Sequence, residues 1–316
     1  MDLTEYNQYL IAKGYSTDTT TGAVSIALKF LEWTDKQGIE ITTINYNDVT
    51  AYIKSNQQRN IKTRTVQYIA TNVNHYLNYL VEAGILSHNP ALALKIKNAK
   101  RKTVYNILSP AELETIYKTY KAELPDKRSS LPPLGERKGG YPPQTLNKLA
   151  RKRNKTLLGL LIYQGIATDD IKNIELSHLE LREGKITIPE TRRSNERTLK
   201  LEPFQILDLF DYINGTRKEI LTLTKKKSNT LFISIGKSNR IQNVLQKLTE
   251  EIVEQNPGIE NLHQIRASVI TNWLKIYNKR KVQYMAGHRY VSSTEAYEAN
   301  NIEALQEDIQ NFYPQL

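Results

Sequence analysis

The chain of 316 residues contains no cysteine. Disulfides, thiolate nucleophiles and cysteine-based zinc sites are therefore excluded. A chain without cysteine also suits a reducing compartment, so a bacterial cytoplasmic location is the expectation. No stretch approaches the roughly 18 consecutive apolar residues that a membrane-spanning helix needs, and no membrane partner is expected.

Acidic residues are scarce relative to basic ones. The chain has 44 Lys and Arg against 33 Asp and Glu, a net charge of +11 and an isoelectric point near 9.4. The stretch from Lys118 to Lys155 holds eleven basic and three acidic residues, so it carries +8 of that charge. Positive charge gathered in one stretch favours a polyanionic partner, most simply nucleic acid, over a dispersed basic surface.

Residues 1–98 are predicted to form a small domain of four helices. Apolar residues recur there at helical spacing. The second helix is expected to turn Val24, Leu28 and Leu31 toward the core, with Ile26, Phe30 and Trp33 beside them. Three glycines stand where helices would end: Gly14, Gly38 and Gly84. Four helices joined by short links make a compact bundle.

Two basic segments of this half are candidate DNA contacts. Arg59, Lys62 and Arg64 lie between the third and fourth predicted helices, where a helix N-terminus and basic side chains suit a phosphate. Residues 95–102 read KIKNAKRK and include Lys100, Arg101 and Lys102. We interpret 99–107 as a basic linker between two domains. For Arg59, Lys62 and Arg64 the alternative interpretation is a solvated basic loop. For the linker it is a flexible tether.

The second predicted domain spans residues 108–316 and is mainly helical. Ser109 and Pro110 have the pattern of an N-cap followed by proline at the first helical position. A basic loop is predicted within 124–150, because 124–144 is rich in proline, glycine and charge. The further expected elements are a helix over 145–163, a β-hairpin over 185–201, a helix over 204–223, a short strand over 230–235, and helices over 239–253, 263–276, 279–286 and 300–312.

One constellation of chemical groups stands near the end of the chain. It consists of His263-x-x-Arg266, then Gly287-His288, then Tyr297 nine residues later. Arginine binds phosphate oxygens with two parallel donors, histidine moves protons near neutral pH, and tyrosine can act as a covalent nucleophile. Together these groups suit attack by a phenol oxygen on a phosphate.

This pattern resembles the second signature box of the tyrosine recombinases of the lambda-integrase and Xer type. The resemblance covers His263, Arg266, Ala286-Gly287-His288 and Tyr297, with their order and spacing. The first signature box of that family reads Gly-Leu-Arg, whereas residues 165–167 here read Gly-Ile-Ala. Ala167 therefore stands where the family has its first catalytic arginine.

The resemblance implies a fold and a mechanism. The fold is an N-terminal four-helix, SAM-like core-binding domain followed by a catalytic domain. Tyr297 would attack a DNA phosphate and form a 3′-phosphotyrosyl link, while Arg266 and His288 hold the phosphate oxygens and His263 assists proton transfer. No metal and no cofactor are implied.

Three further arginines complete the predicted site. Arg192 stands in the hairpin turn at the position of the family's catalytic lysine. Arg193 and Arg289 are expected to contact DNA. Two exposed turn arginines without a catalytic role are the alternative interpretation of Arg192 and Arg193.

The function implied is site-specific DNA recombination or integration by a mobile element. The implied partners are double-stranded DNA attachment sites, three further copies of the chain in a tetramer on two duplexes, and a partner recombinase or an accessory DNA-bending protein. Because of Ala167, the alternative is a catalytically impaired DNA-binding protein on a recombinase fold. A type IB topoisomerase is a third interpretation, which the N-terminal helices and the motif spacing disfavour.

Overall fold

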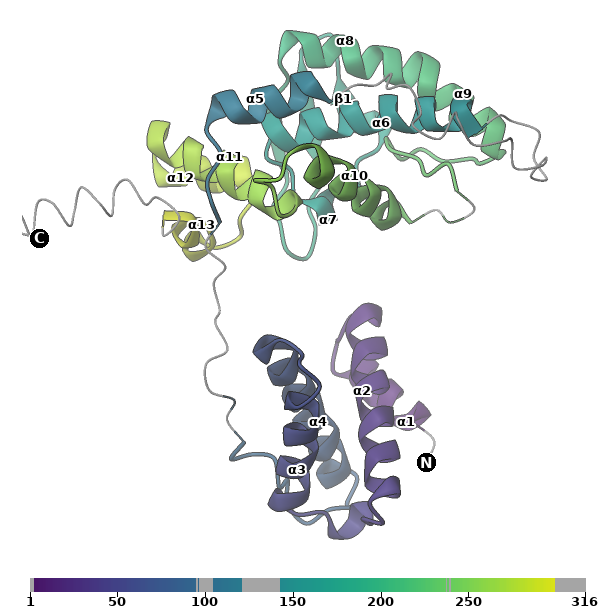
Figure 1. The fold of residues 1–316 in the computed structure, drawn as a ribbon, viewed down its shortest axis with the longest axis vertical. Helices are drawn as coiled ribbons and strands as arrows, with labels where there is room; N and C mark the ends of the chain where they lie inside the picture. Colours follow the sequence, from purple (N-terminus) through teal and green to yellow (C-terminus); the bar gives the residue numbers. More distant parts are fainter. Residues whose placement is uncertain are drawn as a thin grey trace, which may run out of the picture. The chain divides into compact units, whose positions relative to one another are not determined.

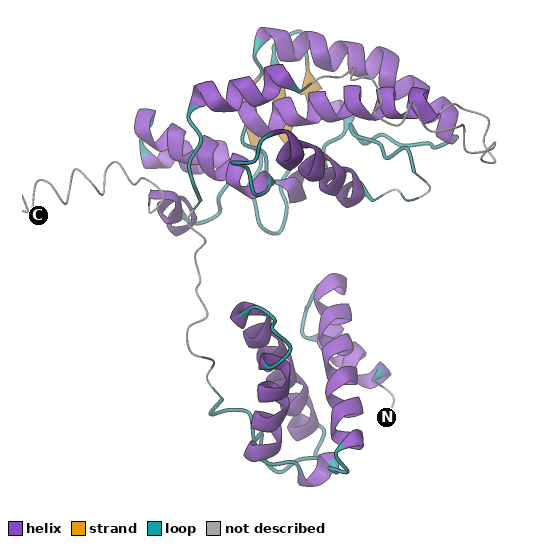
Figure 2. Cartoon of the chain, in the orientation of Figure 1, coloured by secondary structure: helices purple, strands orange, loops and turns teal. Residues whose placement is uncertain are grey.

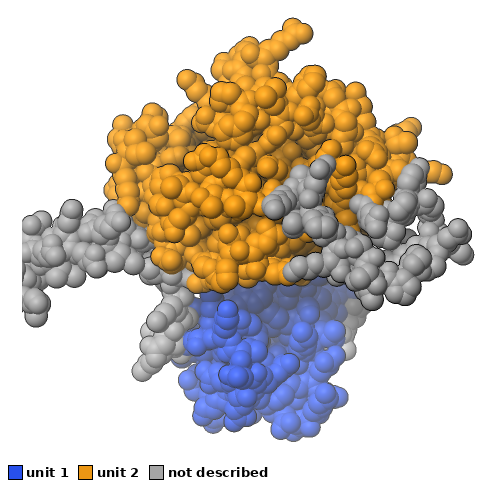
Figure 3. Space-filling view, turned by 45° about the horizontal axis from the view of Figure 1, so that its top comes forward, with its two compact units in different colours: residues 1–103 blue, residues 104–316 orange. Residues whose placement is uncertain are grey.

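The computed structural model describes residues 3–94, 96, 105–120, 143–236, 238 and 240–298. The chain divides into two compact units, Met1–Thr103 and Val104–Leu316 (Figure 3). Helices dominate both units, and the strands described form one small sheet in the second (Figure 2). The predicted fold class, mainly helical with a small sheet, is confirmed. Within the described ranges, no helix is both long and apolar enough to cross a lipid bilayer.

The first unit contains the expected helices (Figure 1). They are α1 (Thr4–Ala12), α2 (Thr17–Lys36), α3 (Tyr46–Gln57) and α4 (Thr63–Glu82), with a 3-10 turn over Ile41–Thr43. Gly14, Gly38 and Gly84 follow α1, α2 and α4 with φ of +80°, +63° and +72°. A residue without a Cβ adopts this left-handed conformation at little cost, so the glycines end these helices as predicted.

All four helices of the first unit contribute to its core, and α2 and α4 contribute two facing surfaces of it. The buried face of α4 carries Val73, Tyr76 and Leu80, while α2 buries Ala27 and Phe30 completely. The prediction that Leu28 faces the core was wrong, because that side chain is 47% exposed. Small residues on α2 let it lie close to α4, and the stripe through Ala23, Ala27 and Phe30 faces inward instead.

The second unit begins its described part with α5 (Pro110–Thr119). Ser109 accepts a hydrogen bond from the backbone N–H of Glu112, and the Glu112 carboxylate accepts one in return, which forms the predicted N-terminal cap. The remaining helices of this unit are α6 (Pro143–Tyr163), α7 (Thr168–Ile171), α8 (Pro203–Asp211), α9 (Arg217–Thr224), α10 (Ile241–Gln255), α11 (Leu262–Ile276), α12 (Lys279–Ala286) and α13 (Val291–Glu298), with a 3-10 turn over Leu176–His178 and a π turn over Tyr212–Thr216.

Helix α6 runs through the middle of the second unit (Figure 1). Its second half is apolar on every side, since Leu157, Leu158, Leu160, Leu161 and Ile162 are all buried. It packs against α5, α8 and α11. Because α6 begins at Pro143, the helix predicted over 145–163 is confirmed and starts two residues earlier, and the end of the predicted basic loop, residues 143–150, lies in this helix.

The sheet consists of β1 (Leu179–Glu180), β2 (Lys185–Ile188) and β3 (Arg197–Lys200), all antiparallel in that order. Ile186 pairs with Leu199, and Ile188 pairs with Arg197. These four side chains face the interior, as the alternation of the sequence predicts for Ile186, Ile188 and Leu199. The predicted hairpin is confirmed, and its turn, residues 189–196, leads toward the site described below.

The predicted strand over 230–235 was wrong. Its apolar residues Leu231, Phe232 and Ile233 are buried, but the backbone forms only a single bridge, between Glu175 and Thr230. The guanidinium of Arg217 donates to the carbonyls of this segment, with Nη2 at 2.6 Å from Ser228 O and 2.8 Å from Thr230 O. A side chain thus satisfies the acceptors that a neighbouring strand would otherwise satisfy.

Part of the predicted layout lies outside the described residues. This holds for most of the linker over 99–107, for residues 124–142 of the basic loop, and for the helix expected over 300–312.

The packing of α2 predicts that substitutions on its buried face and on its exposed face differ in their cost to stability. Phe30→Ala is expected to cost about 3–5 kcal/mol, because it empties a fully buried site beside Tyr52. Leu28→Ala is the matched control on the same helix and is expected to cost within about 0.5 kcal/mol. Hydrogen exchange of the α4 amides measures the stability of this unit alone, and similar losses in both variants would contradict the assignment of the buried face.

Candidate active site

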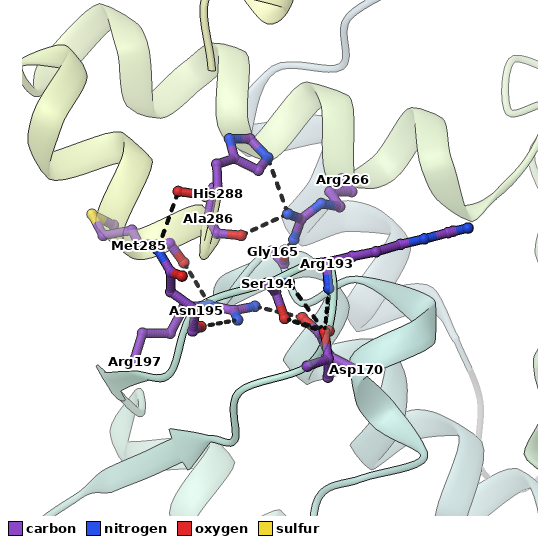
Figure 4. A network of polar contacts seen from close by, with 11 residues as sticks. Gly165, Asp170, Arg193, Ser194, Asn195, Arg197, Arg266, Met285, Ala286 and His288 are labelled. Carbon is purple, nitrogen blue, oxygen red and sulfur yellow. Dashed lines mark hydrogen bonds and ion pairs between the residues drawn. The ribbon is translucent and has the colours of Figure 1, made fainter. Parts of the chain in front are cut away.

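Helix α11 carries Arg266 into the interior of the second unit. Asn261 caps the helix by accepting from the backbone N–H of Gln264 at 3.0 Å. Arg266 is only 8% exposed. Its guanidinium donates to Gly165 O through Nη1, and to Ala286 O through Nη2 at 2.7 Å (Figure 4). A buried guanidinium with two backbone acceptors has a fixed direction, which is what a phosphate-binding group requires.

His288 lies next to Arg266 in a turn after α12. Its Nε2 is 3.3 Å from Nη2 of Arg266, and its Nδ1 is 2.9 Å from Oγ1 of the fully buried Thr294. A guanidinium only donates, so Nε2 must accept, and Nδ1 then carries the proton and donates to Thr294. Burial, with the charges of Arg266 and Arg197 nearby, lowers the pKa of His288 to about 4. The imidazole is therefore neutral at pH 7.

Gly287 forms the turn that presents His288. Its φ is +70°, and a Cβ at this position would lie 2.3 Å from Nη1 of Arg197. Arg197 cannot withdraw, because its side chain is fully buried and ion-paired. Both the backbone conformation and this close approach therefore require glycine here.

Tyr297 lies on α13, beside His288. The two rings are stacked, with centroids 5.6 Å apart and an angle of 10° between their planes. The Tyr297 ring is half-buried against a small apolar cluster formed by Ile270, Val282 and Ala286. Its hydroxyl has no hydrogen-bond partner among the described residues. The structure thus brings the predicted Arg266, His288 and Tyr297 together.

A buried ion pair connects this cluster to α7 and the hairpin. Nη2 of Arg197 lies 3.0 Å from Oδ2 of Asp170, and the two side chains are 0% and 3% exposed. Ser194 Oγ donates to the other Asp170 oxygen at 2.9 Å. Arg197 also donates to Met285 O at 3.1 Å and to Asn195 O at 3.3 Å. Figure 4 shows this network between the hairpin turn and the end of α12.

The hairpin turn is also joined to the His288 turn through its backbone. Asn195 N donates to Gly287 O at 2.9 Å, and Ser194 forms an isolated β-bridge with His288. Sequence reasoning missed Asp170, Ser194, Arg197 and Thr294. Arg197 stands at an inward position of β3, and a charged residue in the apolar alternation of a strand was the available signal.

The other predicted catalytic residues form no hydrogen bond or ion pair with this cluster among the described residues. His263 is exposed on the first turn of α11, and Arg192 is exposed on the hairpin turn. Neither has a hydrogen bond or ion pair among the described residues. Their assignment as catalytic groups stays a prediction.

The two arginines predicted to contact DNA at this site have acidic partners. Nη1 of Arg193 lies 3.6 Å from Asp169. Arg289 Nη2 lies 2.6 Å from Glu190 and donates to Thr191 O at 2.7 Å. A DNA phosphate would compete with these carboxylates, so the DNA contacts of Arg193 and Arg289 stay predictions.

Ala167 marks the start of α7 and is half-buried. It lies between Gly165, which accepts from Arg266, and Asp170, which binds Arg197. The segment that joins these two anchors therefore carries a methyl group at the position where the tyrosine recombinases have their first catalytic arginine.

The first unit presents the predicted basic turn at its surface. Arg59, Lys62 and Arg64 are exposed after α3 and on the first turn of α4, and the described residues form no ion pair with them. Lys100, Arg101 and Lys102 lie outside the described residues. Within the described ranges, no three His, Asp or Glu side chains gather closely enough to hold a metal ion.

Comparison with known proteins decides the family. The phage integrase family matches residues 143–303, just over half of the chain, and this range includes Arg266, His288 and Tyr297. The chain belongs to the phage integrase family. This family assignment confirms the resemblance to tyrosine recombinases.

Relatives and solved structures show similarity over nearly the whole length of this chain. Tyrosine recombinase XerC of Anoxybacillus flavithermus is 23% identical over 93% of this chain and 90% of its own. The fold is similar to XerH bound to its difH substrate in a post-cleavage complex (TM-score 0.64, 17% identity, 95% of this chain and 81% of that one). It is also similar to a lambda integrase tetramer bound to a Holliday junction (TM-score 0.58, 14% identity, 92% and 77%).

The buried ion pair predicts unequal effects of two adjacent carboxylates. Asp170→Asn is expected to lower the free energy of unfolding by about 3–5 kcal/mol, because it leaves the buried Arg197 without a counter-charge. Asp169→Asn is the control, since that carboxylate is 65% exposed and contributes within about 1 kcal/mol. Urea unfolding measures both, and equal losses would show that the buried pair has no special role.

The low pKa of His288 predicts that acid destabilises the chain. Below the ordinary pKa of 6.5 the unfolded chain takes up a proton that the folded chain accepts only near pH 4. Stability is thus complete above pH 6.5 and is lost as pH falls toward 4, by about 3 kcal/mol. We expect His288→Gln to remove this part of the pH dependence, measured by urea unfolding between pH 7 and 4. Parallel curves for the two proteins would contradict the assignment.

Proposed function

We propose that the chain is a site-specific DNA recombinase that breaks and rejoins DNA through a 3′-phosphotyrosyl intermediate. The observation that supports this most directly is the cluster of Arg266, His288 and Tyr297. It combines a buried fixed-direction cation, an imidazole and a phenol without its own hydrogen-bond partner within the described part of the chain. These groups match attack on a phosphodiester, and family membership points to the same chemistry.

In the proposed step, the Tyr297 oxygen bonds to phosphorus while the bond from phosphorus to the 5′ oxygen breaks. The phenol loses a proton and the 5′ oxygen gains one, which leaves a 3′-phosphotyrosyl link and a free 5′ hydroxyl. Because the new link retains the bond energy, a second 5′ hydroxyl can reverse the step on another strand. His263, three residues before Arg266 on α11, is proposed to assist the tyrosine proton.

The phosphate would change the hydrogen bonding of His288. Phosphate oxygens only accept, whereas Nε2 of the free protein accepts from Arg266. Binding would therefore turn the Arg266 donor toward the phosphate and place a proton on Nε2, and a nearby negative charge favours that protonation. Thr294 keeps its hydrogen bond to Nδ1 in either state. Arg192 is proposed to bind the phosphate without donating a proton, since guanidinium groups do not deprotonate in proteins.

The proposed partner is double-stranded DNA at a specific site. The net charge of +11 and the exposed basic turn of Arg59, Lys62 and Arg64 suit contacts with phosphates. Four protomers on two duplexes, with or without an accessory DNA-bending protein, are the assembly proposed. Recombination by a mobile element stays a prediction, because the similar proteins include both an enzyme named XerC and lambda integrase.

Ala167 supports a second candidate function, a DNA-binding protein that finds its site without cutting it. Loss of one preorganised charge at such a site typically slows the chemistry by a factor on the order of 10²–10³. Covalent attachment to DNA separates this candidate from the recombinase. Relaxation of supercoiled DNA without site preference would instead indicate a topoisomerase.

The nucleophile is tested with DNA duplexes selected from a random-sequence pool by binding to the full chain. Nicked versions of the selected duplex, with the nick moved stepwise along it, trap the covalent product, which denaturing gels detect. The wild type and Tyr290→Phe, a control at a tyrosine that is 72% exposed, are expected to form the adduct. Tyr297→Phe is expected to form none.

Two results would change this assignment. An adduct in Tyr297→Phe would refute the nucleophile. Specific binding without an adduct in any protein, including Ala167→Arg, would favour the DNA-binding candidate.

A further inference from the structure

The site has one fixed guanidinium where the phosphate chemistry needs more positive charge. Both non-bridging oxygens gain charge in the transition state, and Arg266 reaches the site from one side only, through α11. The segment before α7 and the hairpin turn border the same site through Gly165 and Ser194, and residue 167 there is alanine. Four other arginines stand close enough in the fold to be considered: Arg192, Arg193, Arg197 and Arg289.

Two of these arginines already have structural roles. Arg197 is fully buried, and its charge is balanced by Asp170, so it cannot reach a phosphate without breaking the network. Arg289 is bound to both Glu190 and Thr191 O, which hold it against the start of the hairpin turn.

Arg193 is the candidate that lies against the α7 segment. Its Nη1 is 3.6 Å from Asp169, which follows Ala167 by two residues. The contact is loose, and the two side chains are 76% and 65% exposed. Exposed pairs of this kind contribute little, so a phosphate can displace Asp169 from Arg193.

The backbone next to Arg193 is held by hydrogen bonds, whereas the Arg193 side chain is 76% exposed. The next residue, Ser194, is 6% exposed, donates to Asp170 and forms the β-bridge with His288. Figure 4 shows Arg193 extending from this anchored part of the turn. Arg192, already proposed to bind the phosphate from the position of the family's catalytic lysine, stands one residue further from the bridge and has no partner among the described residues.

We propose that Arg193 supplies to the scissile phosphate the guanidinium that is missing at position 167, in addition to Arg266 and Arg192. This inference rests on the proposed recombinase function. In the free protein Arg193 pairs with Asp169, and in the DNA complex it binds a non-bridging oxygen opposite Arg266. The hairpin turn thus provides the guanidinium that α7 lacks.

The test compares rates of adduct formation on the nicked duplex. Arg193→Ala is expected to slow the reaction by about 10²–10³-fold. Arg182→Ala removes an exposed arginine between β1 and β2 and is expected to react like the wild type. In the double variant Arg193→Ala with Ala167→Arg, the new arginine is expected to restore the rate to within about tenfold of the wild type, because only the origin of the charge has changed.

A second substrate distinguishes loss of the Arg193 charge from a structural effect of the substitution. A methylphosphonate at the scissile position replaces a charged oxygen by a methyl group, so a missing guanidinium costs less there. We expect the deficit of Arg193→Ala to shrink at least tenfold on this substrate. A merely structural role of Arg193 would leave the deficit unchanged.

The outcomes separate this inference from the proposed function. Wild-type rates in Arg193→Ala, or a deficit that neither Ala167→Arg nor the methylphosphonate reduces, would overturn the role of Arg193. An adduct with Ala167→Arg but none with the wild type would also overturn it, while the proposed chemistry would stand. No adduct with any of these proteins would refute the proposed function itself.

Discussion

The ion pair between Asp170 and Arg197 joins three parts of the second unit that are far apart in the sequence. Asp170 belongs to α7, Arg197 to β3, and the Arg197 guanidinium contacts the backbone of Met285 and Gly287 at the end of α12. Removing two charges from water is costly unless they are paired and hydrogen-bonded, so each residue requires the other in its place. The positions of the hairpin turn and of the His288 turn both depend on this requirement.

The distribution of charge around His288 follows from that arrangement. Arg266 and Arg197 lie on either side of the Gly287 turn, and their charges, with burial, keep the imidazole neutral. A neutral imidazole that accepts from one arginine and donates to Thr294 is held in one tautomer. An anionic phosphate is the ligand that relieves the mutual repulsion of these cations, which links the electrostatics of the free site to the chemistry proposed for it.

The departure at Ala167 is confined to one side chain. Gly165, two residues before it, accepts a hydrogen bond from Arg266, and Asp170, three residues after it, binds Arg197. The backbone frame of the site is therefore retained while one charge is absent. A frame retained in this way leaves room for a cation from a neighbouring segment, and the loosely paired Arg193 on the anchored hairpin turn is the one proposed for that role.

The sequence by itself determined the helical first unit, the hairpin, and the three candidate residues that the structure brings together. Helix periodicity, glycine stops and the spacing of Arg266, His288 and Tyr297 are local properties of the chain, and each can be recognised within a few turns of helix. It did not determine which face of α2 is buried, since close packing on α4 selected Ala27 over Leu28. Nor did it determine the strand over 230–235, whose carbonyls are satisfied by Arg217. Only the tertiary structure decided that Asp170, Ser194, Arg197 and Thr294 support the site, because a buried polar residue is recognisable only through partners that lie far away in the sequence.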